Sequence, residues 1–233
     1  MKALPKFIFV TLAIMALGLG AGEAKATLYN LQYLINGWSG TETNWVTANF
    51  QQNGANTVTL TITGVGLTSG LYVDQLAFNV ASPYASSTNP LTITGYSVIS
   101  GTVGTITFAP GTSITTQNTQ SVSGSGSYGK GFDVLLNFPN PQAQRFNGTD
   151  SVLVTLTGSG LTASAFDVLN TANPPYPGAN VGVHIAGFPA DSQGNTSAFI
   201  TNVPLPNVPI PGAAWLLGSG LFGLVAIRCR MKK

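Results

Sequence analysis

The chain has 233 residues, of which 44% are hydrophobic and 7% charged, and its formal net charge is +2. The positive excess comes from the two ends, because residues 27–202 carry two basic and six acidic side chains, a net charge of −4. Without a stripe of Lys and Arg to neutralise phosphates, this region is not expected to bind nucleic acid. The one cysteine is Cys229, so residues 27–202 form no disulfide and depend on a hydrophobic core, for which their length suffices.

The first 26 residues have the pattern of a secretory signal peptide. Lys2 and Lys6 precede an apolar run over residues 7–21, and Ala24 and Ala26 form a small-x-small cleavage site. We expect export by Sec-type machinery and cleavage after Ala26. The alternative is an uncleaved membrane helix, which the short apolar run disfavours.

Between the two ends the sequence predicts short strands separated by turns. Polar and apolar residues alternate with a period of two over 57–63, 102–108 and 151–157, as in half-buried strands, although Leu153 breaks the polar face of the last segment. Further strands are predicted over 71–80, 91–99, 132–138 and 181–186. Clusters of Gly, Pro, Asn and Ser punctuate them, and no amphipathic helix of ordinary length is visible. We predict an all-β domain over residues 27–202, an antiparallel β-sandwich for which a jelly roll is one fitting topology.

Residues 124–131 contain Gly-x-Gly-x-x-Gly and come close to a P-loop. Both nucleotide motifs require a strand before the loop and a helix after it, because the helix N-terminus helps to hold phosphate. Here a predicted strand follows, and Gly131 stands after Lys130 where a P-loop needs Ser or Thr for magnesium. We interpret the segment as a loop.

Few residues are suited to catalysis or metal binding. His184 is the only histidine and lies in a strand-like segment, where a packed or hydrogen-bonded imidazole is the ordinary expectation. A hydrolase would need a Ser and an Asp beside it, and no Gly-x-Ser-x-Gly elbow precedes a helix. Asp150 and Asp191 lie in loops and offer oxygen ligands to calcium, although turn formation explains them equally well. Glycosidase chemistry would need Glu42 or an Asp to converge on a second acid.

We therefore expect a protein that is not an enzyme and needs no cofactor, with structural calcium left open. A zinc site is disfavoured by the single histidine and the lack of cysteine in residues 27–202. Exposed aromatic rings would instead suit sugar binding by stacking, and core packing of the same rings is the favoured alternative. The aromatic residues considered are Trp38, Trp45, Tyr84, Tyr96 and Tyr176.

The C-terminal end has the layout of a membrane segment. Residues 203–211 are a proline-rich linker, and residues 212–227 carry no charge. A helix over this uncharged run would cover about 24 Å, somewhat less than the ~30 Å hydrocarbon core. The basic cluster of residues 228–233 follows at once and predicts a cytoplasmic tail under the positive-inside rule.

This end resembles the PEP-CTERM sorting signal of Gram-negative bacteria, which is processed by exosortase. The matching residues are Val208, Pro209, Ile210 and Pro211, then Ala213-Ala214-Trp215 and Gly218-Ser219-Gly220-Leu221, then Arg228, Arg230, Lys232 and Lys233. Ile210 departs from the more usual Glu or Leu, and a second Val-Pro-x-Pro at 203–206 leaves the processing point open. An ordinary tail anchor is the alternative.

The resemblance implies an exported protein, held in the inner membrane with its domain in the periplasm before processing and then moved to the cell surface or medium. Together with the uncharged, hydroxyl-rich domain, it predicts a non-catalytic surface or extracellular-matrix protein associated with exopolysaccharide or biofilm. A carbohydrate-binding module is the second hypothesis, and an exported hydrolase that uses His184 is the third.

Overall fold

The computed structural model describes residues 26–123, 125, 129–170 and 178–203. Over these residues the regular elements are β-strands and short 3₁₀-helices, and the paired strands are antiparallel. The predicted all-β class and antiparallel sheets are therefore confirmed.

The strands are β1 (Ala26–Leu31), β2 (Tyr33–Gly37), β3 (Val46–Gln52), β4 (Thr57–Gly64), β5 (Tyr72–Phe78), β6 (Leu91–Ser100), β7 (Thr107–Ala109), β8 (Ser113–Ile114), β9 (Gln120–Ser121), β10 (Lys130–Phe132), β11 (Val134–Asn137), β12 (Phe146–Asn147), β13 (Ser151–Thr157), β14 (Val181–Ala186) and β15 (Ser197–Thr201). The 3₁₀-helices are η1 (Ser82–Tyr84), η2 (Gln142–Gln144) and η3 (Ala163–Phe166).

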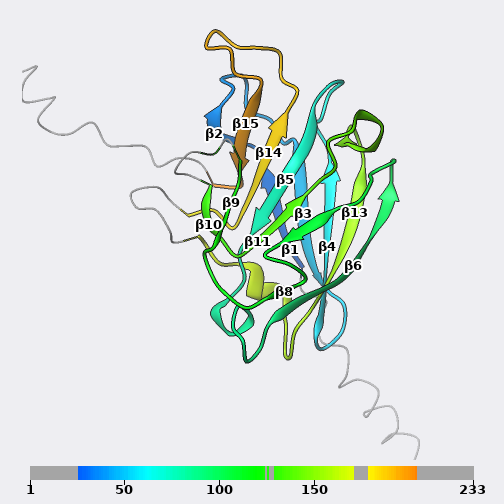
Figure 1. The fold of residues 1–233 in the computed structure, drawn as a ribbon, viewed down its shortest axis with the longest axis vertical. Coiled ribbons are helices and arrows are strands. Elements are labelled where there is room, and N and C mark those ends of the chain that lie inside the picture. Colours follow the sequence, from blue (N-terminus) through cyan, green and yellow to red (C-terminus); the bar gives the residue numbers. More distant parts are fainter. Residues whose placement is uncertain (1–25, 124, 126–128, 171–177, 204–233) are drawn as a thin grey trace, which may run out of the picture.

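Two large sheets make up most of the fold (Figure 1). The six-stranded sheet has the order β1-β3-β4-β13-β6-β8. The seven-stranded sheet has the order β2-β15-β14-β5-β11-β7, with β12 also paired to β5. Strands β9 and β10 form a separate two-stranded pair, and β1 lies against β14 and β15 of the other large sheet.

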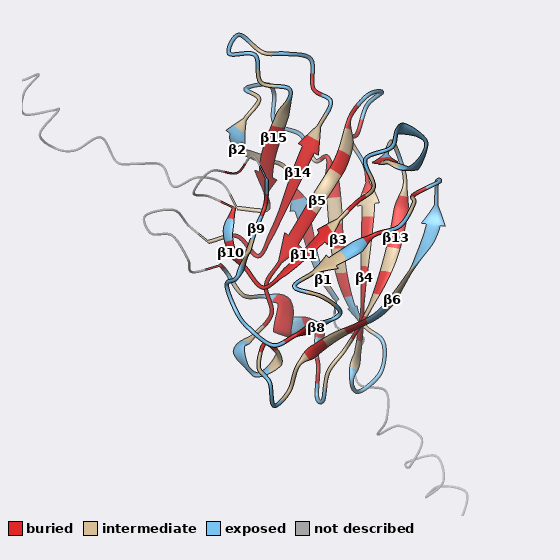
Figure 2. Cartoon of the chain, viewed as in Figure 1, coloured by how far each residue is buried: buried red, intermediate tan, exposed pale blue. Residues whose placement is uncertain are grey.

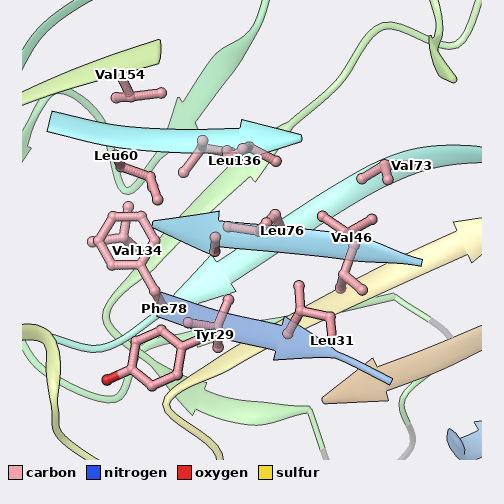
Figure 3. Packing of buried hydrophobic residues seen from close by; sticks show 14 of the residues in the cluster. Tyr29, Leu31, Val46, Leu60, Val73, Leu76, Phe78, Val134, Leu136 and Val154 are labelled. Atoms are coloured by element: carbon pink, nitrogen blue, oxygen red, sulfur yellow. The ribbon is translucent and has the colours of Figure 1, made fainter. Parts of the chain in front are cut away.

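The two large sheets share one hydrophobic core. Side chains of the six-stranded sheet, such as Leu60 and Val154, face Leu76 and Val134 of the seven-stranded sheet (Figure 3). Buried residues follow the central strands, whereas exposed residues occupy the connecting loops and the end of β6 (Figure 2). This is the alternation that strands with one buried face produce.

A group of fully buried rings fills the core near η3. The Phe50 ring stacks on Phe166 with centroids 4.3 Å apart, and both rings make edge contacts with Phe78, at 5.3 and 5.8 Å. Phe50 comes from the six-stranded sheet and Phe78 from the seven-stranded sheet, so these contacts join the two sheets. Offset and edge-on ring pairs of this kind add to the burial energy of the rings themselves.

The predicted strands over 57–63, 71–80, 91–99, 151–157 and 181–186 correspond to β4, β5, β6, β13 and β14. The predicted strand over 132–138 is divided, because β10 ends at Phe132 and β11 begins at Val134.

The strand predicted over 102–108 is wrong except at its end, where β7 begins at Thr107. The backbone N–H of Gly104 donates to the carbonyl of Gln144, and that of Ile106 donates to the Tyr96 hydroxyl. Contacts from other loops and a side chain therefore take the place of a strand ladder here, although Ile106 is still buried.

Several predicted segments lie outside the described residues. These are the signal peptide except Ala26, the linker except Val203, the membrane helix over 212–227 and the tail over 228–233. Within the described part of the chain, no helix has the length and hydropathy needed to span a membrane.

Candidate functional site

Four loops meet at one end of the two large sheets, the upper end in Figure 1. They follow β2 (38–45), β4 (65–71), β11 (138–150, which includes β12) and β14 (187–196). Three hollows lie among these loops. They adjoin one another, since the hollow lined by Trp38, Trp45 and Phe188 shares lining residues with each of the other two. Loops at the end of a rigid sheet framework are the usual place for binding residues in such folds.

The hollow at the centre of this group has a volume of about 340 Å³ and is lined by aromatic rings and hydroxyls. The indole of Trp38 stacks on Phe188 with centroids 4.4 Å apart, and Trp45 meets Phe188 edge-on at 6.2 Å. Trp45 and Phe188 are buried, whereas Trp38 is partly exposed. The hydroxyl-bearing side chains that line the same hollow are Thr41, Thr43, Thr68 and Ser69.

Glycines allow the Trp38 loop to pack closely. Gly37 has a φ of +97°, and a Cβ there would lie 2.3 Å from the carbonyl oxygen of Ser197. The N–H of Trp38 donates to that same oxygen at 2.8 Å, so the loop leaves β2 against the start of β15. Gly40 lies against the six-membered ring of the Trp38 indole, and a Cβ at position 40 would clash with that ring. The chain therefore covers part of Trp38 and leaves the rest facing the hollows.

Asp191 joins the loop after β14 to the Trp38 loop. Its Oδ1 accepts the N–H groups of Gln193 and Asn195, both at 2.9 Å, while its Oδ2 accepts the N–H and hydroxyl of Ser39 at 3.2 and 3.1 Å. These hydrogen bonds, led by the one from the Asn195 backbone, lower the pKa of Asp191 to about 2. The carboxylate considered for calcium thus has protein donors on both oxygens.

Asp150, the other loop carboxylate considered for calcium, forms a local turn. Its Oδ2 accepts the N–H of Asn147 at 3.0 Å, and its own N–H donates to the Asn147 carbonyl. Over the described ranges, no three side chains of His, Cys, Asp or Glu gather as a metal site would require.

A neighbouring hollow of about 200 Å³ contains Arg145. The guanidinium lies 3.9 Å from the centroid of the Tyr72 ring, a cation–π distance. Its Nε donates to the Asn140 carbonyl at 2.7 Å and its Nη2 to the Asn140 side-chain oxygen at 3.2 Å. Thr68, Ser69 and Leu71 line both this hollow and the aromatic one.

The third hollow, of about 410 Å³, lies beside Trp38 and is lined by the end of β2 and by Glu42. A carboxylate oxygen of Glu42 accepts the N–H of Leu34 at 3.1 Å. Glu42 is exposed, and no second carboxylate lines this hollow, as the paired acids of a glycosidase would require.

His184 lines none of these three hollows and lies on the outer face of the seven-stranded sheet, because its strand neighbours Val183 and Ile185 are in the core between the sheets. Its side chain is 9% exposed, and its Nδ1 lies 2.6 Å from Oδ1 of Asp74. The Nε2 atom is buried without a hydrogen-bond partner among the described residues. The expected hydrogen-bonded histidine is confirmed, and the Asp that a hydrolase would need is present.

A Ser-His-Asp site would also need a serine hydroxyl beside the imidazole. Among the described residues, no serine hydroxyl forms a hydrogen bond with His184. Gln75, the ladder partner of His184, accepts the N–H of Ser123 at its Oε1. The hydroxyl of Ser125 is buried and donates to the Val122 carbonyl.

Two further titratable groups hold the fold together. Burial raises the pKa of Asp133, opposed by hydrogen bonds that its carboxylate accepts from the N–H groups of Val80 and Asn118. Burial and the nearby charge of Asp167 raise the pKa of Tyr29, whose hydroxyl donates to the Phe166 carbonyl at 3.1 Å. Both groups connect segments far apart in the sequence.

The aromatic residues considered for sugar binding separate into three groups. Trp38 and Trp45 line the aromatic hollow. Tyr84 donates to the Gly160 carbonyl at 2.7 Å and Tyr96 packs edge-on against Phe108, so both serve the fold. Tyr176 lies outside the described residues.

The sequence interpretation missed Arg145, Tyr72, Phe188 and Asp74. Arg145 had one signal, since it and Lys130 are the only basic residues between 27 and 202. Residues 124 and 126–128 of the glycine-rich segment lie outside the described part, and Lys130 begins β10. A strand therefore begins within the last residues of this segment, where both nucleotide motifs require a helix.

No family model, curated protein or solved structure matches the chain. The function is therefore inferred from the residues themselves.

Proposed function

We propose that the chain is an exported, non-catalytic surface or extracellular-matrix protein that exosortase processes at its C-terminus. It associates with exopolysaccharide or biofilm after Sec-type export. The observation that carries the proposal is the order of the C-terminal segments: Val208-Pro209-Ile210-Pro211, an uncharged run over 212–227 and the basic cluster at 228–233. In the precursor, the run over 212–227 spans the inner membrane as a helix and residues 203–211 form its outer linker.

The described domain supports an extracytoplasmic role. The packing of its two large sheets around one core supports the β-sandwich that we propose for residues 27–202. On the outer face of the six-stranded sheet, half-buried threonines pair across neighbouring strands, as in Thr57 opposite Thr157 and Thr47 opposite Thr63. The strands of this sheet carry no charged side chain, which suits contact with hydrated polymers better than contact with charged partners.

Deletion of residues 208–233 tests the sorting proposal. The full-length protein should be found at the cell surface, and the truncated protein should be found in the periplasm or medium. A matched pair separates the two proline motifs: Pro209→Ala with Pro211→Ala should block processing, and Pro204→Ala with Pro206→Ala should leave it intact. Surface retention of the deletion variant at the full-length level would contradict the proposal.

A carbohydrate-binding module is the second candidate function. The observation that favours it is the hollow in which partly exposed Trp38 lies beside the hydroxyls of Thr41, Thr43, Thr68 and Ser69. Aromatic rings and hydroxyls are the groups that contact the C–H and O–H groups of sugars, and the part of the Trp38 ring left uncovered by Phe188 and Gly40 would make this contact. A glycan array probed with the mature protein should give binding that Trp38→Ala abolishes. Absence of binding to every glycan, including the organism's own polymer, would contradict this candidate.

A further inference from the structure

Arg145 is held in place and is not neutralised by a carboxylate. It is one of two basic side chains in the described part of the chain, and no salt bridge to it occurs there. Asn140 occupies Nε and Nη2, so Nη1 and a second hydrogen of Nη2 remain for another partner. The ring of Tyr72 supports the guanidinium from one side. Such a group loses little freedom on binding, which favours affinity.

The hollow around Arg145 is suited to an anionic group of sugar size. Its volume is about 200 Å³, and none of its lining residues is acidic. Thr68, Ser69, Gln142 and Asn147 supply hydroxyls and amides to the same hollow. Asp150 does not line this hollow, and its carboxylate oxygens lie against the N–H of Asn147 and against Gly101.

The shape of the guanidinium selects among anions. Its planar fork donates two parallel hydrogen bonds to a carboxylate, which is a closer match than a neutral hydroxyl offers. The shared lining by Thr68, Ser69 and Leu71 places this hollow beside the aromatic hollow of Trp38. One polymer chain can therefore contact both, with a sugar ring near the indole and a carboxylate at Arg145.

We propose that the Arg145 hollow binds the carboxylate of a uronate residue in an acidic polysaccharide. This inference rests on the carbohydrate-binding candidate above and specifies its ligand class. The net charge of −4 over residues 27–202 repels a polyanion at long range. Binding is therefore local, and it should weaken only modestly with salt because a single cation makes the contact.

The test uses the mature protein and polygalacturonate, with the same polymer after reduction of its carboxyl groups as the neutral control. Isothermal titration calorimetry should show binding to polygalacturonate, and Arg145→Gln should weaken it by about tenfold or more. Lys130→Gln removes the same charge elsewhere and should change the affinity less than about twofold. Arg145→Lys keeps the charge without the planar fork and should lie between the two.

Thermal unfolding of each variant shows whether the fold is retained, and Arg145→Lys provides the comparison if Arg145→Gln fails to fold. Equal binding of both polymers, together with an unchanged affinity of the Arg145 variants, would overturn the uronate inference and leave carbohydrate binding standing. Binding to neither polymer would overturn the uronate inference, and the glycan array then decides the carbohydrate candidate separately. Full binding of polygalacturonate by Arg145→Gln would also overturn the inference.

Discussion

Nδ1 of His184 lies 2.6 Å from Oδ1 of Asp74 because the ladder between β14 and β5 contains a bulge at this point. His184 pairs with Gln75 and the next residue of β14 pairs with Val73, so Asp74 has no partner in the ladder. Since Val73 and Leu76 both point into the core, Asp74 and Gln75 lie together on the outer face. The bulge thus brings a carboxylate to the imidazole.

Removal of the Asp74 carboxylate should destabilise the fold. Asp74→Ala leaves both nitrogens of a buried imidazole without a protein partner, at a cost of about 1–3 kcal/mol in the free energy of unfolding. Asp74→Asn keeps an oxygen that can accept the Nδ1 hydrogen and should cost less. Urea denaturation of the mature variants measures both. Equal stability of Asp74→Ala and wild type would show that the hydrogen bond contributes nothing.

The contribution of Asp191 to the free energy of unfolding should depend on pH between about 4 and 2. The folded pKa of Asp191 is lowered from 3.8 to about 2, so its contribution is fully present above pH 3.8 and is lost as the pH falls toward 2. Asp191→Asn removes this titration. The difference in Tm between wild type and variant should therefore shrink over that window. A difference that stays constant from pH 5 to pH 2 would contradict the role of Asp191.

The stacked rings in the core should carry much of the stability. Phe166→Ala removes the partner of Phe50 and opens a cavity between the sheets, so we expect a loss of about 3–5 kcal/mol. Ile99→Thr changes an exposed residue of β6 and should stay within about 0.5 kcal/mol of wild type. Denaturant titration compares the two, and similar losses would mean that the core near η3 is packed differently.

Gly37 should be intolerant of a side chain for two separable reasons. Gly37 and Gly54 both have positive φ, at +97° and +109°, but only Gly37 has a backbone oxygen where a Cβ would lie. Gly54→Ala should cost about 1–2 kcal/mol from backbone conformation alone. Gly37→Ala should cost distinctly more, because Ser197 must also move. Equal losses in thermal unfolding would exclude the close contact.

Much of the sheet structure could be predicted from the sequence for those strands that bury only one of their two faces. The alternation over 151–157 corresponds residue for residue to β13, which pairs with β4 and β6 on its two sides. The same alternation failed over 102–108, because the Tyr96 hydroxyl and the Gln144 carbonyl bind the backbone there. Strands of two residues such as β8 and β9 are too short for a periodic pattern.

The candidate site was less predictable, because its pairs are far apart in the sequence. Trp38 stacks on Phe188, and Arg145 covers Tyr72, only because β2, β5, β12 and β14 end or begin at the same edge. The partner of His184 depends on a bulge, which the alternation of β5 does not reveal. The sequence indicated that Trp38 and His184 were candidates, but the geometry that distinguishes them comes from the strand topology.

The identity of the mature chain's two terminal residues tests the central claim, that this is an exported protein sorted through its C-terminal signal. These two residues can be identified by intact-mass spectrometry of protein recovered from the cell surface, combined with sequencing of its terminal peptides. The account predicts a first residue of Thr27 and a last residue within 203–211. A surface protein that still ends in Lys233 would contradict it.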